Sequence, residues 1–108
     1  MNNQNLKTRR IALHNELVRI LGSSNVYFQP PETLQMKYPA IVYERYDMPV
    51  LNADNEKYLR NCKYRVTVID PTPDSSAVDE LSKLKFAKFS RHFATNGLNH
   101  DVFLVYWY

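Results

Sequence analysis

The sequence contains few of the residues from which active sites and metal sites are usually built. Only two glycines, Gly22 and Gly97, occur among 108 residues, and Cys62 is the single cysteine. Two separated glycines exclude a glycine-rich phosphate-binding loop. One cysteine excludes an intramolecular disulfide and the paired cysteines of common zinc motifs. We therefore expect a chain that folds on its apolar core alone, in a reducing compartment.

Long apolar runs are also missing. No stretch approaches the length that spans a bilayer, and residues 1–10 lack the apolar core of a signal peptide. We expect one soluble domain over residues 1–108, made in a cytoplasm and without a membrane partner. The formal charge of +3, from 14 basic and 11 acidic residues, permits a nucleic-acid partner but does not require one.

No group of residues has the pattern of a catalytic or metal centre. His14, His92 and His100 lack metal-ligand spacing, and the carboxylates are scattered. No activating base is recognisable for Cys62, so we interpret it as a buried, unreactive thiol. The sequence therefore predicts no enzyme activity, no cofactor, no metal and no small-molecule substrate.

The central feature is a pair of segments rich in β-branched and aromatic residues, Tyr38–Asp47 and Tyr58–Asp70. Together they predict an antiparallel hairpin, in which the second strand has one face for a core and one for water. The residues on the apolar side of that strand are Cys62, Tyr64, Val66 and Val68. The connecting loop, Asp47–Lys57, is about twice the usual length for a hairpin and mixes apolar with polar residues. We predict that this loop contacts another protein surface; the alternative is a solvated connection.

A first helix is predicted from Leu6 to Leu21, because apolar residues recur on one helical face and Gly22 provides a stop. Ile11 and Val18 form a second apolar stripe beside that face. This stripe is either the margin of a wide core contact or a surface for a partner.

Two further strands are predicted. The short segment Val26–Phe28 is followed by Pro30 and Pro31, which indicates a strand at the edge of a sheet. The last run, Asp101–Tyr108, is apolar on both faces, so we expect neither side of it to face water.

A second helix is predicted from Ser75 or Ser76 to the dipeptide Asn96-Gly97. Asp79 and Glu80 follow the serines and suit the positive end of a helix dipole. The predicted core face of this helix comprises Val78, Ser82, Phe86, Phe89 and Phe93.

Basic residues gather near the N-terminus and on one flank of the predicted second helix. Such a stripe would release counterions from nucleic-acid phosphates, whereas the simpler alternative is a solvated flank favoured by the helix dipole. The aromatic residues do not alternate with these cations as they would in a stacking platform, so we favour the solvated flank. The flank comprises Lys85, Lys88 and Arg91, with Leu84 exposed among them.

The predicted order is helix, strand, strand, strand, helix, strand. This indicates an α+β fold, with a mostly antiparallel sheet of about four strands and two helices packed on one face.

This order of elements resembles the tail terminator, or tail completion, proteins of long-tailed bacteriophages. The resemblance is carried by the segments Val26–Phe28, Tyr38–Glu44, Tyr64–Asp70 and Val102–Trp107. It implies a virion protein of the tail or neck, made in the host bacterial cytoplasm. The family forms a ring, usually a hexamer, that caps the tail tube and joins it to the head, so tube and head-connector proteins would be its partners. The resemblance also implies no cofactor and no active site.

Two alternatives stay open at this point. One is another head–tail connector or minor capsid protein, and the other is a small basic nucleic-acid-binding module. The excess of apolar surface over the needs of one core independently favours self-association. The predicted oligomer or partner interface comprises Met48, Val50, Leu51, Asn52, Asp54, Leu84, Lys88, Arg91, Ile11 and Val18.

Overall fold

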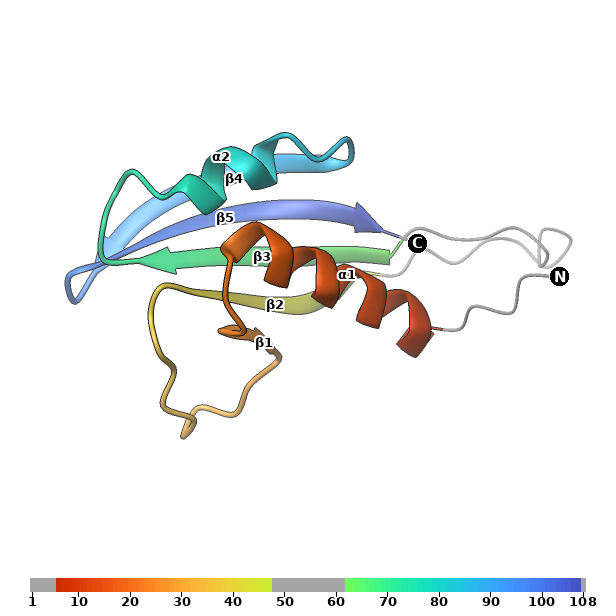
Figure 1. Cartoon of the computed structure of the whole chain (residues 1–108), viewed down its shortest axis with the longest axis horizontal. Coiled ribbons are helices and arrows are strands. Elements are labelled where there is room, and N and C mark those ends of the chain that lie inside the picture. The colour runs from red at the N-terminus through yellow and green to blue at the C-terminus, as the bar shows by residue number, and fades with distance from the viewer. Residues whose placement is uncertain (1–5, 48–61, 108) are drawn as a thin grey trace, which may run out of the picture.

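Five strands form one mixed sheet, and two helices lie on the same face of it (Figure 1). The computed structural model describes residues 6–47 and 62–107. The strand order across the sheet is β1-β2-β3-β5-β4. The α+β prediction is therefore confirmed, with five strands where about four were expected. In chain order the elements are α1 (Leu6–Leu21), β1 (Val26–Phe28), β2 (Ala40–Asp47), β3 (Cys62–Asp70), α2 (Ser76–Ser82), β4 (Ala87–Thr95) and β5 (Leu98–Trp107).

The sheet is antiparallel except at one edge. Strand β3 pairs with β2 on one side and β5 on the other, both antiparallel, whereas β1 pairs with β2 in parallel. The predicted hairpin of β2 and β3 is confirmed, and so is the edge position of β1. The predicted contact loop lies in residues 48–61, outside the described residues.

Helix α1 has the predicted bounds because its apolar period ends at a residue suited to a stop. Gly22 adopts φ 80°, and its N–H donates to the carbonyl of Val18 at 2.8 Å. Leu13 and Leu17 are fully buried against the sheet. The second stripe divides: Val18 packs partly buried against the core, while Ile11 is 43% exposed.

The core lies between the helices and the inner face of the sheet. The predicted alternation of β3 is confirmed, since the four residues on its apolar side are all buried. The largest fully buried side chains are Tyr43, Tyr64 and Phe103, from three neighbouring strands. Burying a side chain of this size stabilises the fold by roughly 1.5–3 kcal/mol. These three strands therefore supply much of the stability.

The second helix is much shorter than predicted. Helix α2 spans seven residues, and the hydroxyl of its N-cap, Ser75, accepts a hydrogen bond from the Ala77 N–H at 3.2 Å. Lys83 ends the helix, and the following Leu84 packs partly buried against the core. The expectation that Leu84 is exposed on a helix flank is therefore wrong.

Residues 87–95 form strand β4, so the prediction of helix there is wrong. Asn96 and Gly97 adopt φ 54° and 75°, which makes them the two-residue turn of a hairpin and not the end of a helix. Two positive φ values give a type I′ turn, whose twist matches that of the paired strands. Strand β5 offers a long apolar partner, and pairing with it outweighs the helical spacing of the phenylalanines. The predicted core face consequently does not exist as one surface.

A β-bulge in β4 decides which side chains share a face. Phe89 pairs with Phe103, but Arg91 pairs with Val102, so Ser90 is an extra residue. One extra residue reverses the alternation beyond it. Phe89 therefore faces the helix side, whereas Arg91 and Phe93 face the opposite side of the sheet.

Candidate interaction surfaces

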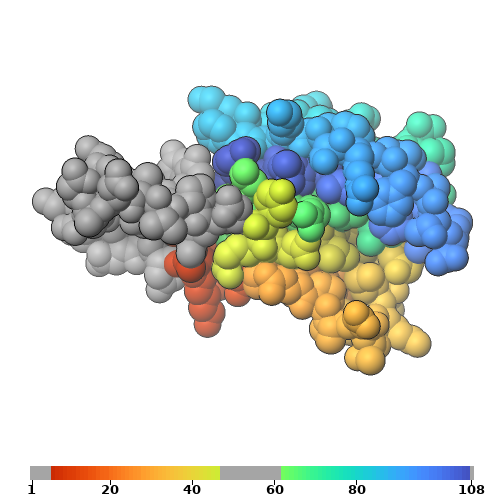
Figure 2. Space-filling view, turned by 180° about the vertical axis from the view of Figure 1, so that it is seen from behind, coloured from red at the N-terminus to blue at the C-terminus, as the bar shows by residue number. Residues whose placement is uncertain are grey.

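The face of the sheet opposite the helices is uncovered by any other described element. Figure 2 shows it from behind, with β2 in yellow, β3 in green and β4 and β5 in blue. We call this the open face. It is formed by the outward residues of β2 to β5, and it is neither wholly polar nor wholly apolar.

On one half of the open face, cations lie over tyrosine rings. Arg65 Cζ is 4.6 Å from the ring centroid of Tyr46, a residue 46% exposed. Lys63 Nζ is 5.5 Å from the same centroid and 5.1 Å from that of Tyr106. Such contacts stabilise by about 0.5–1 kcal/mol at exposed sites. Glu44 pairs with Arg65 on this half, and the backbone register places Asp47 opposite Lys63.

The other half of the open face repeats the pattern on β4 and β5. Arg91 Cζ lies 5.0 Å from the centroid of Phe93, and Phe93 stacks on His100 at 4.6 Å with the rings 12° from parallel. Lys88 pairs with Leu104 and shares this face. Lys88 and Arg91 thus lie on a strand and not on a helix flank. From the sequence we expected the aromatic residues not to alternate with these cations. On this half of the open face they do, since Arg91 lies over the ring of Phe93.

A hollow of about 390 Å³ lies between the two halves. Val102 and Leu104 of β5 form its apolar floor, Tyr46 and Arg65 line it from β2 and β3, and β4 contributes Ser90 and Arg91. The hollow opens to solvent on the face shown in Figure 2. It therefore combines two apolar side chains, an aromatic ring, a hydroxyl and two guanidinium groups.

The second candidate surface is the outer edge of β4. This strand is nine residues long, ends the sheet, and is exposed at every position after Ala87. Phe86 beside it is exposed, as are Phe89 at 50% and Phe93 at 37%. The opposite edge, β1, is only three residues long. An exposed edge strand presents unpaired backbone N–H and C=O groups that another strand could pair with.

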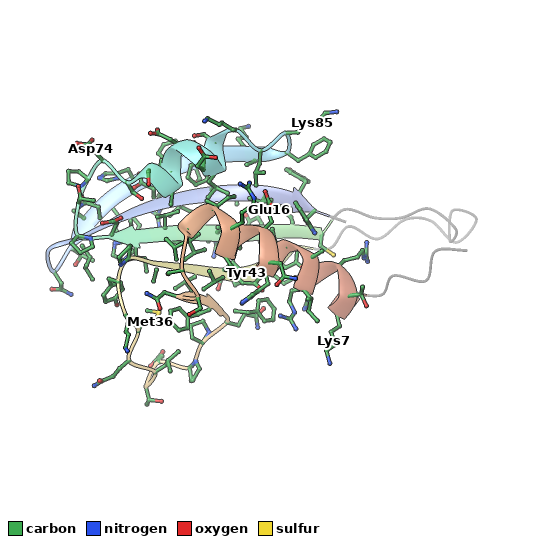
Figure 3. All side chains as sticks on the ribbon, in the orientation of Figure 1. Lys7, Glu16, Met36, Tyr43, Asp74 and Lys85 are labelled. Carbon is green, nitrogen blue, oxygen red and sulfur yellow. The ribbon has the colours of Figure 1, made fainter. Side chains whose placement is uncertain are left out.

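A third cluster lies between α1 and the sheet, where Figure 3 shows Tyr43 pointing under the helix. A hydrogen bond of 2.8 Å joins His14 Nδ1 to the Tyr43 hydroxyl. Burial, and next the charge of Arg10, lower the pKa of His14. Burial raises the pKa of Tyr43, with Arg10 acting in the opposite direction. The cluster ties helix to sheet, and we assign it a structural role.

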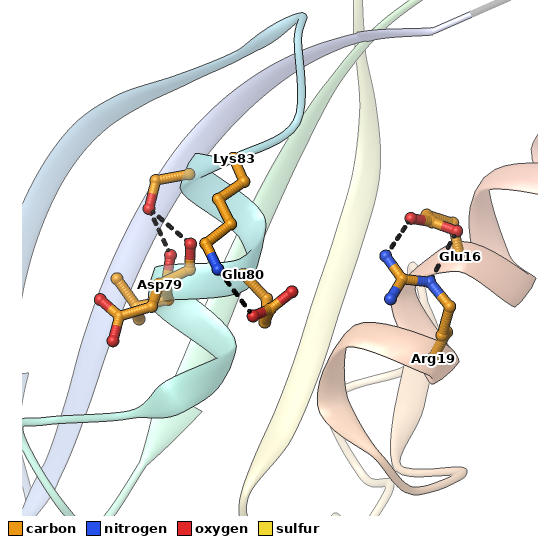
Figure 4. Close-up of polar contacts among 7 residues, drawn as sticks. Glu16, Arg19, Asp79, Glu80 and Lys83 are labelled. Atoms are coloured by element: carbon orange, nitrogen blue, oxygen red, sulfur yellow. Dashed lines mark hydrogen bonds and ion pairs between the residues drawn. The ribbon is translucent and has the colours of Figure 1, made fainter.

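The outer surface of the helices carries ordinary ion pairs (Figure 4). Arg19 Nε donates to Glu16 Oε1 at 3.1 Å, and this hydrogen bond lowers the pKa of Glu16. Lys83 Nζ lies 3.1 Å from Glu80 Oε2. Exposed pairs of this kind contribute little to stability. They provide charged control positions on the layer opposite the open face.

The predicted interface residues do not gather on one surface. Lys88 and Arg91 lie on the open face, Leu84 and Val18 pack against the core from the helix side, and Ile11 is exposed on α1. The remaining five, Met48, Val50, Leu51, Asn52 and Asp54, fall outside the described residues. Sequence reasoning missed the tyrosines of the open face and the edge of β4. The signal for β4 was the Asn96-Gly97 dipeptide between two apolar runs.

No three His, Cys, Asp or Glu side chains among residues 6–47 and 62–107 are grouped so that they could hold a metal ion. None of the described helices is both long and apolar enough to cross a membrane. Comparison with known proteins finds no family model and no curated protein that matches this chain.

Proposed function

We propose that this protein is a virion structural protein that self-associates into a ring, as expected from its resemblance to phage tail terminators. The observation that carries the proposal is the outer edge of β4. It is nine residues long, exposed and bordered by phenylalanines. Natural proteins usually shorten or cover such edges, because an uncovered edge can pair with another chain. Strand β4 carries Lys88, Arg91 and a bulge, which limit pairing, but it is long and no other described element covers it. A subunit interface is the function that best accounts for a long edge strand that is left uncovered.

The geometry of pairing decides the kind of assembly. Pairing of β4 with β4 of a second copy is a two-fold contact and stops at a dimer. If β4 instead binds a different surface of the neighbouring copy, the contact is head-to-tail. Such contacts close into a ring when the rotation between neighbouring subunits divides a full turn evenly. The proposal commits to the head-to-tail contact, with six copies as the expected number. Six copies of a 12.7 kDa chain have a mass of about 76 kDa.

A proline substitution in β4 tests this interface. Thr95 and Leu98 close the two-residue turn and pair with each other, so the N–H of the next residue, Ala94, points away from β5. Ala94→Pro removes a donor from the outer edge while retaining the ladder with β5. Gln35→Pro, in an exposed connecting segment, is the matched control.

Light scattering over a concentration series is the measurement. We expect the parent and Gln35→Pro to reach about 76 kDa, from six chains of 12.7 kDa, and Ala94→Pro to remain smaller. Circular dichroism confirms that each variant is folded. A strictly monomeric parent at millimolar concentration, or a folded Ala94→Pro that assembles like the parent, would overturn the proposal.

A further inference from the structure

We propose that the open face binds single-stranded nucleic acid, with a base in the hollow and phosphates on the surrounding cations. The inference goes beyond self-association, since it uses a different surface from the edge of β4. It rests on the shape of the hollow, the identity of its lining and the charge around it.

The hollow suits a nucleobase. Val102 and Leu104 give it an apolar floor, and the exposed Tyr46 lies at its side. Stacking on an aromatic side chain tolerates any base, because every base has a π-face. The guanidinium groups of Arg65 and Arg91, together with the Ser90 hydroxyl, offer donors to base edges or to the sugar–phosphate backbone.

The charge around the hollow suits a phosphate chain. Four of the described side chains on the open face are cations and one, Glu44, is a carboxylate; the backbone register also places Asp47 opposite Lys63 on this face. The cations lie on β3 and β4, so they flank the hollow on both sides. A single nucleic-acid strand that crosses the sheet from β2 to β4 would place successive phosphates near these cations. Its bases would contact the aromatic rings of the open face. The four cations are Lys63, Arg65, Lys88 and Arg91.

The shape of the face favours a single strand over a duplex. Bases in a duplex are stacked inside it, out of reach of rings that lie along a sheet. Sequence reading in a duplex usually requires a helix or a β-ribbon that enters a groove, and neither projects from this face within residues 6–47 and 62–107. Unpaired bases can turn outward and stack on Tyr46 or Tyr106.

Fluorescence anisotropy with a labelled 20-nucleotide oligo-dT tests the proposal, at protein concentrations where the chain is monomeric. A 20-base-pair duplex and inorganic polyphosphate serve as competitors. We expect oligo-dT to bind more tightly than the duplex and polyphosphate to compete poorly at equal phosphate concentration. Affinity should fall with salt, because binding releases counterions from the strand.

Two pairs of variants separate the open face from the rest of the molecule. Tyr46→Leu, beside the hollow, should weaken binding on the order of tenfold, while Phe89→Leu, at a similarly exposed aromatic residue that faces the helices, should not. Arg91→Gln should weaken binding and reduce the slope of log affinity against log salt by about 0.7. Lys83→Gln on the helix layer should leave both unchanged.

Three results would overturn the proposal. They are equal or tighter binding of the duplex, full competition by polyphosphate, and equal losses of affinity in Tyr46→Leu and Phe89→Leu. Full competition by polyphosphate would identify a general anion surface without base contacts. Because every measurement uses monomeric protein, failure here leaves the self-association proposal intact, and failure of self-association leaves this one testable.

Discussion

His92 and Asp101 face each other across β4 and β5 on the helix side of the sheet, with His92 Nδ1 2.7 Å from Asp101 Oδ1. This contact exists because of the bulge at Ser90. In a regular strand His92 would lie on the opposite face from Phe89. With the bulge, Phe89 and His92 both face the helix side, and Arg91 lies on the open face. One residue therefore sets the composition of two surfaces.

Deletions in β4 test this account of the register. Deleting Ser90 removes the bulge but leaves Phe89 opposite Phe103 and Arg91 opposite Val102, so we expect a small change in stability. Deleting His92 instead also removes the extra residue and leaves Phe89 opposite Phe103, but it moves Arg91 to the helix side opposite Asp101 and removes the His92–Asp101 contact.

Thermal unfolding of the two deletion variants gives the comparison. We expect the His92 deletion to lower Tm by several degrees more than the Ser90 deletion does. Equal losses would show that the bulge does not control the register.

The turn between β4 and β5 provides a second test. Gly97 adopts φ 75°, and an added Cβ would meet no other atom within 4 Å, so the cost of Gly97→Ala is one of backbone conformation alone. A left-handed conformation costs an ordinary residue about 1–2 kcal/mol. Denaturant unfolding should show this loss, and Ser24→Ala, at an exposed position without positive φ, should show almost none. If Gly97→Ala left the free energy of unfolding unchanged, the left-handed conformation of residue 97 in this turn would be contradicted.

The reactivity of Cys62 reports on core packing. Cys62 is the first residue of β3, and it is 1% exposed and belongs to the same core cluster as Tyr64, Val66 and Val68. A thiol reagent should label it slowly in the native protein and quickly in denaturant, because labelling requires an opening of the structure. Labelling at the denatured rate under native conditions would contradict the placement of Cys62 in the core.

The His14–Tyr43 contact predicts a dependence of stability on pH. The pKa of His14 is lowered in the folded state, so below about pH 6.5 the unfolded chain binds more protons at this site than the folded protein does. The free energy of unfolding should therefore fall as pH drops below about 6.5. Above that pH this site should cause no loss. His14→Gln should flatten this part of the profile, while Tyr43→Phe should cost about 1 kcal/mol at pH 8 through loss of the hydrogen bond. A profile unchanged by His14→Gln would show that another group governs it.

The elements that could be predicted from the sequence are those whose local pattern agrees with the fold. Helix α1 has an apolar period of one helical face and a glycine stop, and β3 alternates residue by residue. In α1 and β3, propensity, periodicity and tertiary packing all indicate the same structure. The bounds predicted for α1 and the buried faces predicted for both elements are therefore correct.

The C-terminal part was predicted wrongly because two local signals conflict. Phe86, Phe89 and Phe93 are spaced as on a helix, and serines with acidic residues precede them. The bulge at Ser90 hides the alternation that would mark β4, so only the Asn96-Gly97 dipeptide indicates the hairpin. The open face could not be predicted either, because it joins residues of four strands, and the bulge decides which residues of β4 belong to it.

Amide hydrogen exchange along β4 at low and high protein concentration tests the central claim, self-association through this edge, most directly. We predict that exchange at His92 and Ala94, whose N–H groups point away from β5, slows as the concentration rises. The amides of α1 should exchange at the same rate throughout. Exchange along β4 that is independent of concentration, while a larger species forms, would contradict the account.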